Sequence, residues 1–350
     1  MKMIKFVYYL AIGLMIGYFS ANKTTAQEKK QYKVGCIAFY NQENLFDTIA
    51  QPNDHEFTPD GINLWNTQKY RIKLDHMSTV ISQIGSELFP GGPAILGISE
   101  VENRSVVEDL VNTPKLKASK YDFVHYESPD KRGVDVALLY RKDFFKVLSS
   151  RSVRLRVESM PDWTTRDQLV VTGIFDDEQI DIIVNHWPSR SGGEKRSQPL
   201  REAAAALTKS LVDSIYKSNP NAKIFIMGDL NDDPINNSVQ KILNAKGKQD
   251  DVKEGGLFNP MWKLYKEGTG SLAYQDSWSL FDQIIISKPL LGEDKSTFKF
   301  YKAKVFNAPI VVQKDGQYAG YPYRTYAGGA WQGGYSDHLP VYMFIIKEKK

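Results

Sequence analysis

Four segments of the sequence place carboxylate or carboxamide side chains at the border of an apolar run rich in β-branched residues. They are Phe39–Glu43, Ile98–Glu100, Gly228–Asn231 and Ser336–Pro340. An apolar run of this kind predicts a buried strand, so each segment would deliver an oxygen ligand to one end of a sheet. Mg²⁺ takes oxygen ligands and commonly bridges one or two carboxylates to a substrate phosphate. The pattern therefore indicates metal-dependent chemistry on phosphate esters.

Two further motifs, Asn185–Arg190 and Phe281–Ile285, complete a set whose order along the chain resembles the endonuclease/exonuclease/phosphatase superfamily. The resemblance runs from about Lys33 to the C-terminus, and its most specific part is the pair Gly-Asp-Leu-Asn and Ser-Asp-His-Leu-Pro. It suggests a secreted, bacterial-type member. The fold it implies is α/β: a four-layer, deoxyribonuclease I-like sandwich of two packed mixed β-sheets flanked by helices. The cofactor it implies is Mg²⁺ or Mn²⁺.

The resemblance assigns metal and phosphate ligands to this sequence. Glu100 matches the principal metal ligand of the superfamily, Glu43 would lie near the metal, and we place Asp337 with them. Asn41 would contact the phosphate or a metal-bound water. Glu102 competes with Glu100, and Glu100 is preferred because it directly ends the apolar run.

Asp229 and Asn231 are the candidates for activating water and contacting the phosphate, as the resemblance implies. Side chains in an extended segment alternate with period two, so these two would project to the same side. A simple turn is the alternative, because Gly-Asp and the segment Asn231–Pro234 both favour turns.

His338 is the candidate for handling a proton or stabilising the transition state. Histidine titrates near neutrality and serves this role when a carboxylate fixes its tautomer, and Asp282 resembles the orienting Asp of the superfamily. His186 matches the second histidine of the deoxyribonuclease and sphingomyelinase branches, where it would donate a proton or stabilise charge. Its orienting carboxylate is not evident, and Asp135 is a guess.

Two loops could contact the substrate. Arg190 adjoins the His-Trp-Pro motif and begins a basic loop suited to phosphate oxygens. The segment Tyr318–Tyr335 interleaves aromatic residues with glycines. These rings could stack on bases or sugars, or they could pack against the domain.

The N-terminus has the organisation of a secretory signal. A charged start is followed by an apolar run over residues 6–21 and a small-residue exit, with cleavage expected after Ala26. We therefore expect a signal peptide at 1–26, a catalytic domain at 27–350, and a secreted or periplasmic protein without stable membrane insertion. An uncleaved anchor, which needs roughly 20 apolar residues, is the alternative.

Composition limits the partners and cofactors. Removal of residues 1–26 takes away three lysines and no acidic residue, so the net charge falls from +4 to +1 and gives no general argument for nucleic acid. Cys36 is the only cysteine, which excludes an intrachain disulfide and a thiolate zinc site. No repeat or linker marks a second domain.

Periodicity predicts the elements that position these residues. Helices are expected over Asn66–Phe89 and Gln198–Lys217. Strands are expected over Val34–Tyr40, Ala94–Ser99, Tyr121–Tyr126, Asp135–Tyr140, Val153–Val157, Leu169–Phe175, Ile180–Asn185 and Lys223–Met227.

The sequence thus predicts a monomeric, divalent-metal-dependent phosphoesterase that hydrolyses phosphodiester bonds, with an extracellular or periplasmic endonuclease acting on DNA or RNA as the first candidate. A phosphatase or phosphodiesterase acting on lipid, inositol or sugar phosphates is the alternative, and an inactive binding protein of the same fold is a third possibility. A zinc hydrolase is weaker, because none of the five histidines forms a His-x-His or His-Glu-x-x-His pair.

Overall fold

A computed structural model describes residues 30–52 and 56–349 of the chain. The predicted signal peptide lies outside these residues. From Tyr32 on, the described residues form one compact unit. No helix within the described ranges combines the length and apolarity needed to cross a bilayer.

Two mixed β-sheets form the centre of this unit. The six-stranded sheet has the order β14-β17-β1-β2-β4-β3 and the seven-stranded sheet the order β5-β6-β7-β8-β13-β10-β9. The first comprises β1 (Tyr32–Leu45), β2 (Ile95–Val101), β3 (Tyr121–His125), β4 (Asp135–Arg141), β14 (Lys299–Val305) and β17 (Val341–Glu348). The second comprises β5 (Phe145–Val153), β6 (Gln168–Phe175), β7 (Glu178–His186), β8 (Lys223–Asp229), β9 (Ala245–Lys246), β10 (Leu257–Phe258) and β13 (Asp282–Ser287).

The central strands of the seven-stranded sheet are apolar on both faces, because both faces are covered. Along β8, Phe225 and Met227 point into the core shared with the six-stranded sheet. Ile224 and Ile226 point the other way, into a separate cluster with Ala204 and other side chains of α4 (Glu194–Ser218). This period-two division explains why these strands are near-continuous apolar runs in the sequence.

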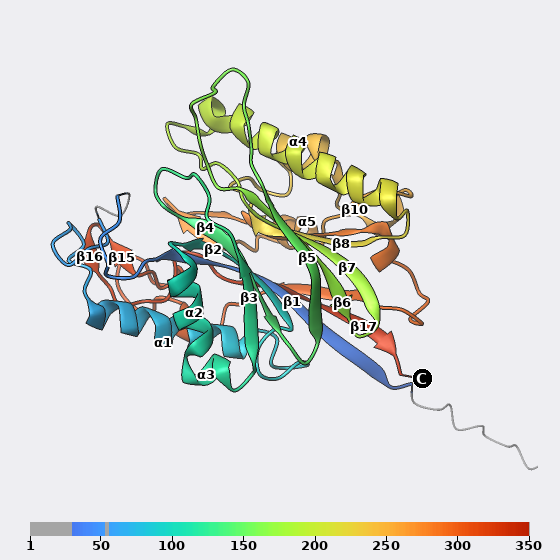
Figure 1. Cartoon of the computed structure of the whole chain (residues 1–350), viewed down its shortest axis with the longest axis horizontal. Helices are drawn as coiled ribbons and strands as arrows, with labels where there is room; N and C mark the ends of the chain where they lie inside the picture. The colour runs from blue at the N-terminus through green and yellow to red at the C-terminus, as the bar shows by residue number, and fades with distance from the viewer. Residues whose placement is uncertain (1–29, 53–55, 350) are drawn as a thin grey trace, which may run out of the picture. The chain divides into compact units, whose positions relative to one another are not determined.

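Helices cover the outer faces of both sheets and complete four layers (Figure 1). In Figure 1, α4 lies over the seven-stranded sheet, and α1 (Thr67–Gln83), α2 (Arg104–Asn112) and α3 (Pro114–Lys117) lie on the side of the six-stranded sheet. The side chain of Asn66 caps α1 by accepting the N–H of Lys69. The predicted fold class is confirmed.

Shorter elements complete the described chain. They are the helix α5 (Met261–Lys266), the hairpins β11 (Leu272–Tyr274)–β12 (Ser277–Ser279) and β15 (Tyr326–Ala327)–β16 (Ala330–Trp331), a π-helical turn at Ser238–Ile242, and 3₁₀ turns at Gln249–Asp251, Lys288–Leu290 and Pro309–Val311.

One predicted strand is misplaced. The alternation over Val153–Val157 suggested a strand, but the strand is β5, which ends at Val153. β5 is the edge strand of its sheet and pairs only with β6, so many of its side chains are exposed and polar and its apolar alternation is weak. The residues after it gave a false signal because Leu155 packs in the cluster under α4.

Candidate active site

The register of three strands sets His186, Asp229 and Asp282 in a row. His186 is the partner of Asp229 across the parallel pair β7–β8, and Asp229 is the partner of Asp282 across the antiparallel pair β8–β13. Gly228 is required before Asp229, because a Cβ at this position would clash with the backbone of Asn185 on β7. The Gly-Asp motif therefore marks a close approach of two strands.

The end of the six-stranded sheet faces this row with a distorted backbone. The β1–β2 pairing shifts register between Asn41 and Leu45, and the β2–β4 pairing shifts between Ser99 and Val101. Glu43 and Glu100 lie in these shifts with φ values of +47° and +59°. A left-handed conformation is costly for a residue with a Cβ, and such outliers gather where a side chain must be aimed. Two of the three predicted metal ligands are thus aimed by strained backbone.

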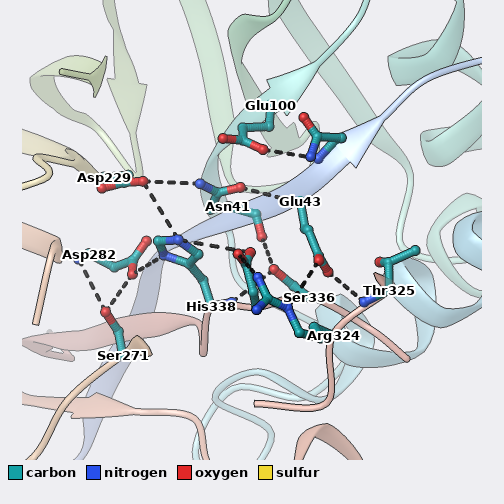
Figure 2. Close-up of polar contacts among 12 residues, drawn as sticks. Asn41, Glu43, Glu100, Asp229, Ser271, Asp282, Arg324, Thr325, Ser336 and His338 are labelled. Carbon is teal, nitrogen blue, oxygen red and sulfur yellow. Dashed lines mark hydrogen bonds and ion pairs between the residues drawn. The ribbon is translucent and has the colours of Figure 1, made fainter. Parts of the chain in front are cut away.

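Asp229 is the centre of the cluster (Figure 2). Its Oδ2 accepts a hydrogen bond from Asn41 Nδ2 at 3.1 Å, and its Oδ1 accepts the backbone N–H of Asn231 at 2.9 Å. His186 Nε2 and His338 Nε2 lie 3.6 Å and 3.8 Å from Oδ2. The Asn231 side chain instead donates to the backbone oxygen of Trp187 at 2.9 Å and fixes the loop.

His338 is paired with Asp282 as predicted. His338 Nδ1 lies 2.7 Å from Asp282 Oδ2, which also accepts a hydrogen bond from Ser271 Oγ at 2.5 Å. Burial opposes charge on the imidazole, but the carboxylates of Asp282 and Asp229 outweigh it and raise the pKa of His338 well above its ordinary value. The geometry therefore holds a charged imidazole with Nε2 directed toward Asp229.

Burial gives Asp229 an unusual protonation equilibrium. It raises the pKa of Asp229 to about 6, although the His338 cation acts in the opposite direction. A carboxylate that titrates near neutrality is suited to accept a proton from water.

The metal-free protein should show the cost of this buried charge. The pKa of Asp229 is about 6 in the folded protein and about 4, the ordinary value for Asp, in the unfolded chain. Ionisation of Asp229 therefore favours the unfolded chain. This loss of stability is absent below pH 4, grows between pH 4 and 6, and is complete above pH 6. Asp229→Asn cannot ionise. Between pH 4 and pH 7 its free energy of unfolding should therefore gain about 3 kcal/mol relative to wild type, as measured by urea denaturation with a chelator. A difference that does not change with pH would contradict this.

His186 is held in its neutral form in this site. Burial, and then the nearby guanidinium groups of Arg166 and Arg132, lower the pKa of His186 well below its ordinary value. Its Nδ1 has no hydrogen-bond partner among the residues that the structure describes. The guess that Asp135 orients it is wrong, because the Asp135 carboxylate pairs with His125 Nε2 at 2.9 Å and accepts the N–H of Ser128.

The three predicted metal carboxylates each have a cationic neighbour. Arg132 Nη2 lies 3.1 Å from Glu100 Oε1, Arg324 Nη2 lies 2.7 Å from Asp337 Oδ2, and Lys73 Nζ lies 4.0 Å from Glu43 Oε2. The competing residue Glu102 accepts the backbone N–H of Asp47 at 2.7 Å.

Within the described ranges, two groups of three side chains each place potential ligand atoms within 4.8 Å of one another. One group is Asp229, Asp282 and His338, and the other is His125, Glu127 and Asp135. Neither group contains a predicted metal carboxylate, so Glu43, Glu100 and Asp337 are not drawn together into a tight cage.

The charge and chemistry of the site nevertheless fit a divalent cation. Five carboxylates face four cationic side chains: Glu43, Glu100, Asp229, Asp282 and Asp337 against Lys73, Arg132, Arg324 and the charged His338. Burial and the neighbouring Asp337 carboxylate raise the pKa of Glu43 to about 7. The cluster is thus short of positive charge, and its donors are the oxygens that Mg²⁺ prefers.

Arg190 lies apart from this cluster. Its guanidinium donates to the backbone oxygen of Asn231 at 3.0 Å and to Asp232 and Asn236 at 3.2 Å, and it packs over the ring of Phe281. These contacts hold the loop that follows Asp229. Because these contacts use the Nε–H and Nη2–H groups of Arg190, little of the guanidinium is left to bind a phosphate as the sequence predicted.

Sequence reasoning missed the lysine and arginine cations of the site. Lys73 is fully buried and donates to Thr325 Oγ1 and to the backbone oxygen of Tyr335. It lies on α1, where a lysine ordinarily belongs to the solvated face, so the sequence carries no signal for it. Arg132 comes from a loop with no motif around it, and Arg324 lies in the aromatic segment Tyr318–Tyr335, whose pattern gave no signal for a cation.

A family model identifies the family of the chain. A family model described as the endonuclease/exonuclease/phosphatase family matches residues 36–347. No curated protein sequence matches the chain significantly.

Solved structures share the fold at low identity. A family protein from Bacteroides thetaiotaomicron has 17% identity and a TM-score of 0.53, with 91% of this chain and 97% of that chain covered. Mannosyl-6-phosphatase from B. thetaiotaomicron VPI-5482 has 17% identity and a TM-score of 0.52, covering 89% and 99%. D. rerio TDP2 complexed with a single-strand DNA product has 14% identity and a TM-score of 0.51, covering 89% and 98%.

Proposed function

The chain belongs to the endonuclease/exonuclease/phosphatase family, and from this premise we propose that it is a divalent-metal-dependent hydrolase of phosphate esters that acts through the cluster around Asp229. The observation that carries the proposal is the buried set Asn41, Asp229, Asp282 and His338, joined by contacts of 2.7 to 3.8 Å. Such a set has a proton acceptor, a charged imidazole and an amide directed at one point.

Asp229 receives a proton from the attacking water in this proposal. One carboxylate oxygen is held by Asn41 and the other by the backbone of Asn231, so the carboxylate has a fixed orientation. The water oxygen bonds to phosphorus as the P–O ester bond on the opposite side breaks, and the leaving oxygen takes a proton from solvent water. Positioning of the water is the main contribution of Asp229.

His338 and His186 stabilise the phosphoryl group. Asp282 holds His338 in its charged form with Nε2 free to donate to a phosphate oxygen, where charge accumulates in the transition state. His186 is neutral, so it donates a hydrogen bond rather than a full charge.

Glu100, Glu43 and Asp337 are the residues that would hold Mg²⁺ or Mn²⁺. When bound, the ion would neutralise charge on a phosphate oxygen. Arg132 and Arg324, whose side chains are 46% and 44% exposed, can move aside or contact the phosphate themselves.

The proposed activity is tested by hydrolysis of a set of phosphate esters. The purified protein is assayed with Mg²⁺ or Mn²⁺, and with a chelator, on methyl phosphate, mannose 6-phosphate, a nucleoside monophosphate and supercoiled plasmid. Metal-dependent release of phosphate or nicking is expected for at least one substrate. Nicking would support the endonuclease predicted from sequence, release from the small esters would support a phosphatase, and no hydrolysis of any substrate would contradict the proposal.

Export remains part of the proposal. The apolar run over residues 6–21 and the small-residue exit at Ala26 support a cleaved signal and a secreted or periplasmic enzyme. N-terminal sequencing of protein expressed with its leader should begin at Gln27, and an intact N-terminus would count against cleavage.

A further inference from the structure

A cavity of about 340 Å³ opens beside the candidate active site. One wall is the β11–β12 hairpin, which contributes Tyr274 and Gln275, and the other is the loop before β15, which contributes Gln317 and Tyr318. The size is at the lower end of the range for small-molecule pockets, roughly 300–1,000 Å³. A single sugar-sized ring is a suitable occupant.

The cavity shares Arg324 and Asp337 with the active site. These two side chains form an ion pair of 2.7 Å, and Asp337 Oδ1 lies 3.9 Å from His338 Nε2. A phosphate at His338 would therefore have its ester group beside the mouth of the cavity.

The walls of the cavity are fixed to each other. Tyr321 donates its hydroxyl to Asp276 Oδ1 at 2.5 Å and accepts the backbone N–H of Asp276 at 2.8 Å. The Tyr321 ring also packs edge-on against Trp278 on β12. The cavity thus exists before a ligand binds.

Gln275 is held at the cavity by an unfavourable turn. Gln275 and Asp276 form the two-residue turn of the hairpin with φ values of +48° and +61°. Such turns strongly prefer Asn-Gly or Asp-Gly, because both central residues need positive φ. A glutamine tolerated at this position is consistent with a role for its side chain.

The exposed groups in the cavity match a neutral polyhydroxylated ring. Tyr274 and Tyr318 are 69% and 48% exposed, so their faces are free to pack against C–H groups. Gln275 and Gln317 make no side-chain hydrogen bond within the described part of the chain. An amide both donates and accepts, as a hydroxyl group does.

We propose that this cavity binds the sugar ring of a sugar phosphate whose phosphate is hydrolysed at the neighbouring site. The inference rests on the proposed phosphate-ester hydrolase activity and specifies its substrate class. A polynucleotide is disfavoured, because single-stranded nucleic acid requires a basic groove along its backbone, and Arg324, the single cationic residue among those lining the described cavity, is paired with Asp337.

The test compares two substrates in the metal-loaded enzyme. Wild type should have a kcat/KM for glucose 6-phosphate at least about 100-fold above that for methyl phosphate, which fills only the phosphate site. Tyr318→Ala should raise KM for glucose 6-phosphate about tenfold, by analogy with aromatic stacking elsewhere, and Gln275→Gly about fivefold for the loss of one neutral hydrogen bond. Neither variant should change kcat/KM for methyl phosphate.

Gln275→Gly also guards against misfolding as an explanation, because glycine adopts the positive φ of this turn without strain. Tyr301→Ala is the matched control, since Tyr301 is a 52% exposed tyrosine on β14 that does not line the cavity. Equal losses on both substrates, no loss on glucose 6-phosphate, or a preference for plasmid would overturn the sugar site. Failure of wild type on every substrate would instead overturn the proposed hydrolase activity.

Discussion

Replacement of Asp229 by asparagine is expected to lower kcat about 10³-fold on any ester that the enzyme hydrolyses, a size typical for the loss of a positioned acid or base. Asparagine keeps the shape of the side chain but cannot take a proton from water. The two oxygens of Asp229 accept hydrogen bonds from the Asn41 amide and from the Asn231 N–H, and the single amide oxygen of asparagine replaces only one of these acceptors. KM should change little, because substrate contacts at Asn41, His338 and the cavity remain. Steady-state kinetics with saturating Mg²⁺ or Mn²⁺ measure both parameters.

Asp181→Asn is the matched control for this loss. Asp181 is a buried aspartate on β7, at the end of the strand away from His186, where it accepts a hydrogen bond from Thr172. The control should retain wild-type kcat. If Asp229→Asn retains more than about a tenth of wild-type kcat, general base catalysis by Asp229 is wrong.

Loss of Glu100 should remove the response of the protein to metal. Ion binding to the folded state at about 100 times its dissociation constant stabilises that state by about 2.7 kcal/mol, which corresponds to roughly 5 °C in Tm for a domain of this size. Glu100→Gln should lose most of this shift, because a neutral amide replaces the anionic oxygen aimed into the cluster by the strained turn of β2. Thermal unfolding with and without Mn²⁺ measures this effect independently of activity.

Glu102→Gln provides the comparison for Glu100→Gln. Glu102 is two residues away, and its carboxylate accepts the N–H of Asp47, which a glutamine oxygen can also accept. The Glu102 variant should keep the metal shift. A full metal shift in Glu100→Gln, or an equal loss in both variants, would show that Glu100 does not hold the ion.

Much of the site could be predicted because its residues follow strands with clear sequence signals. The apolar runs before Glu100 and Asp229 become β2 and β8. The pairing of His338 with Asp282, 56 residues apart, came from the family resemblance and not from periodicity.

Other features depend on tertiary structure alone. Asp135 was a reasonable guess for orienting His186, but it begins β4 in the six-stranded sheet and is already paired with His125 there. Lys73 is buried on a helix whose sequence shows only an ordinary lysine. Gln275 and Tyr318 are 43 residues apart, and they line one cavity because Asp276 bonds Tyr321.

The aromatic loop packs against the domain through some of its rings, as one of the two interpretations of its sequence predicts, and stacking of the others on a substrate stays a prediction. Tyr326 and Trp331 pack against the core, with ring centroids 5.3 Å apart, whereas Tyr318 remains exposed at the cavity. Glycine-rich spacing cannot distinguish these cases, because the direction of each ring depends on the hairpin β15–β16 that the loop forms.

The central claim is that water attacks phosphorus at Asp229, and hydrolysis in H₂¹⁸O tests it most directly. Using the best substrate of the wild-type enzyme with Mg²⁺ or Mn²⁺, mass spectrometry should find one ¹⁸O atom in the phosphate product and none in the alcohol. Label in the alcohol would place the attack at carbon, and it would contradict the mechanism that the geometry around Asp229 supports.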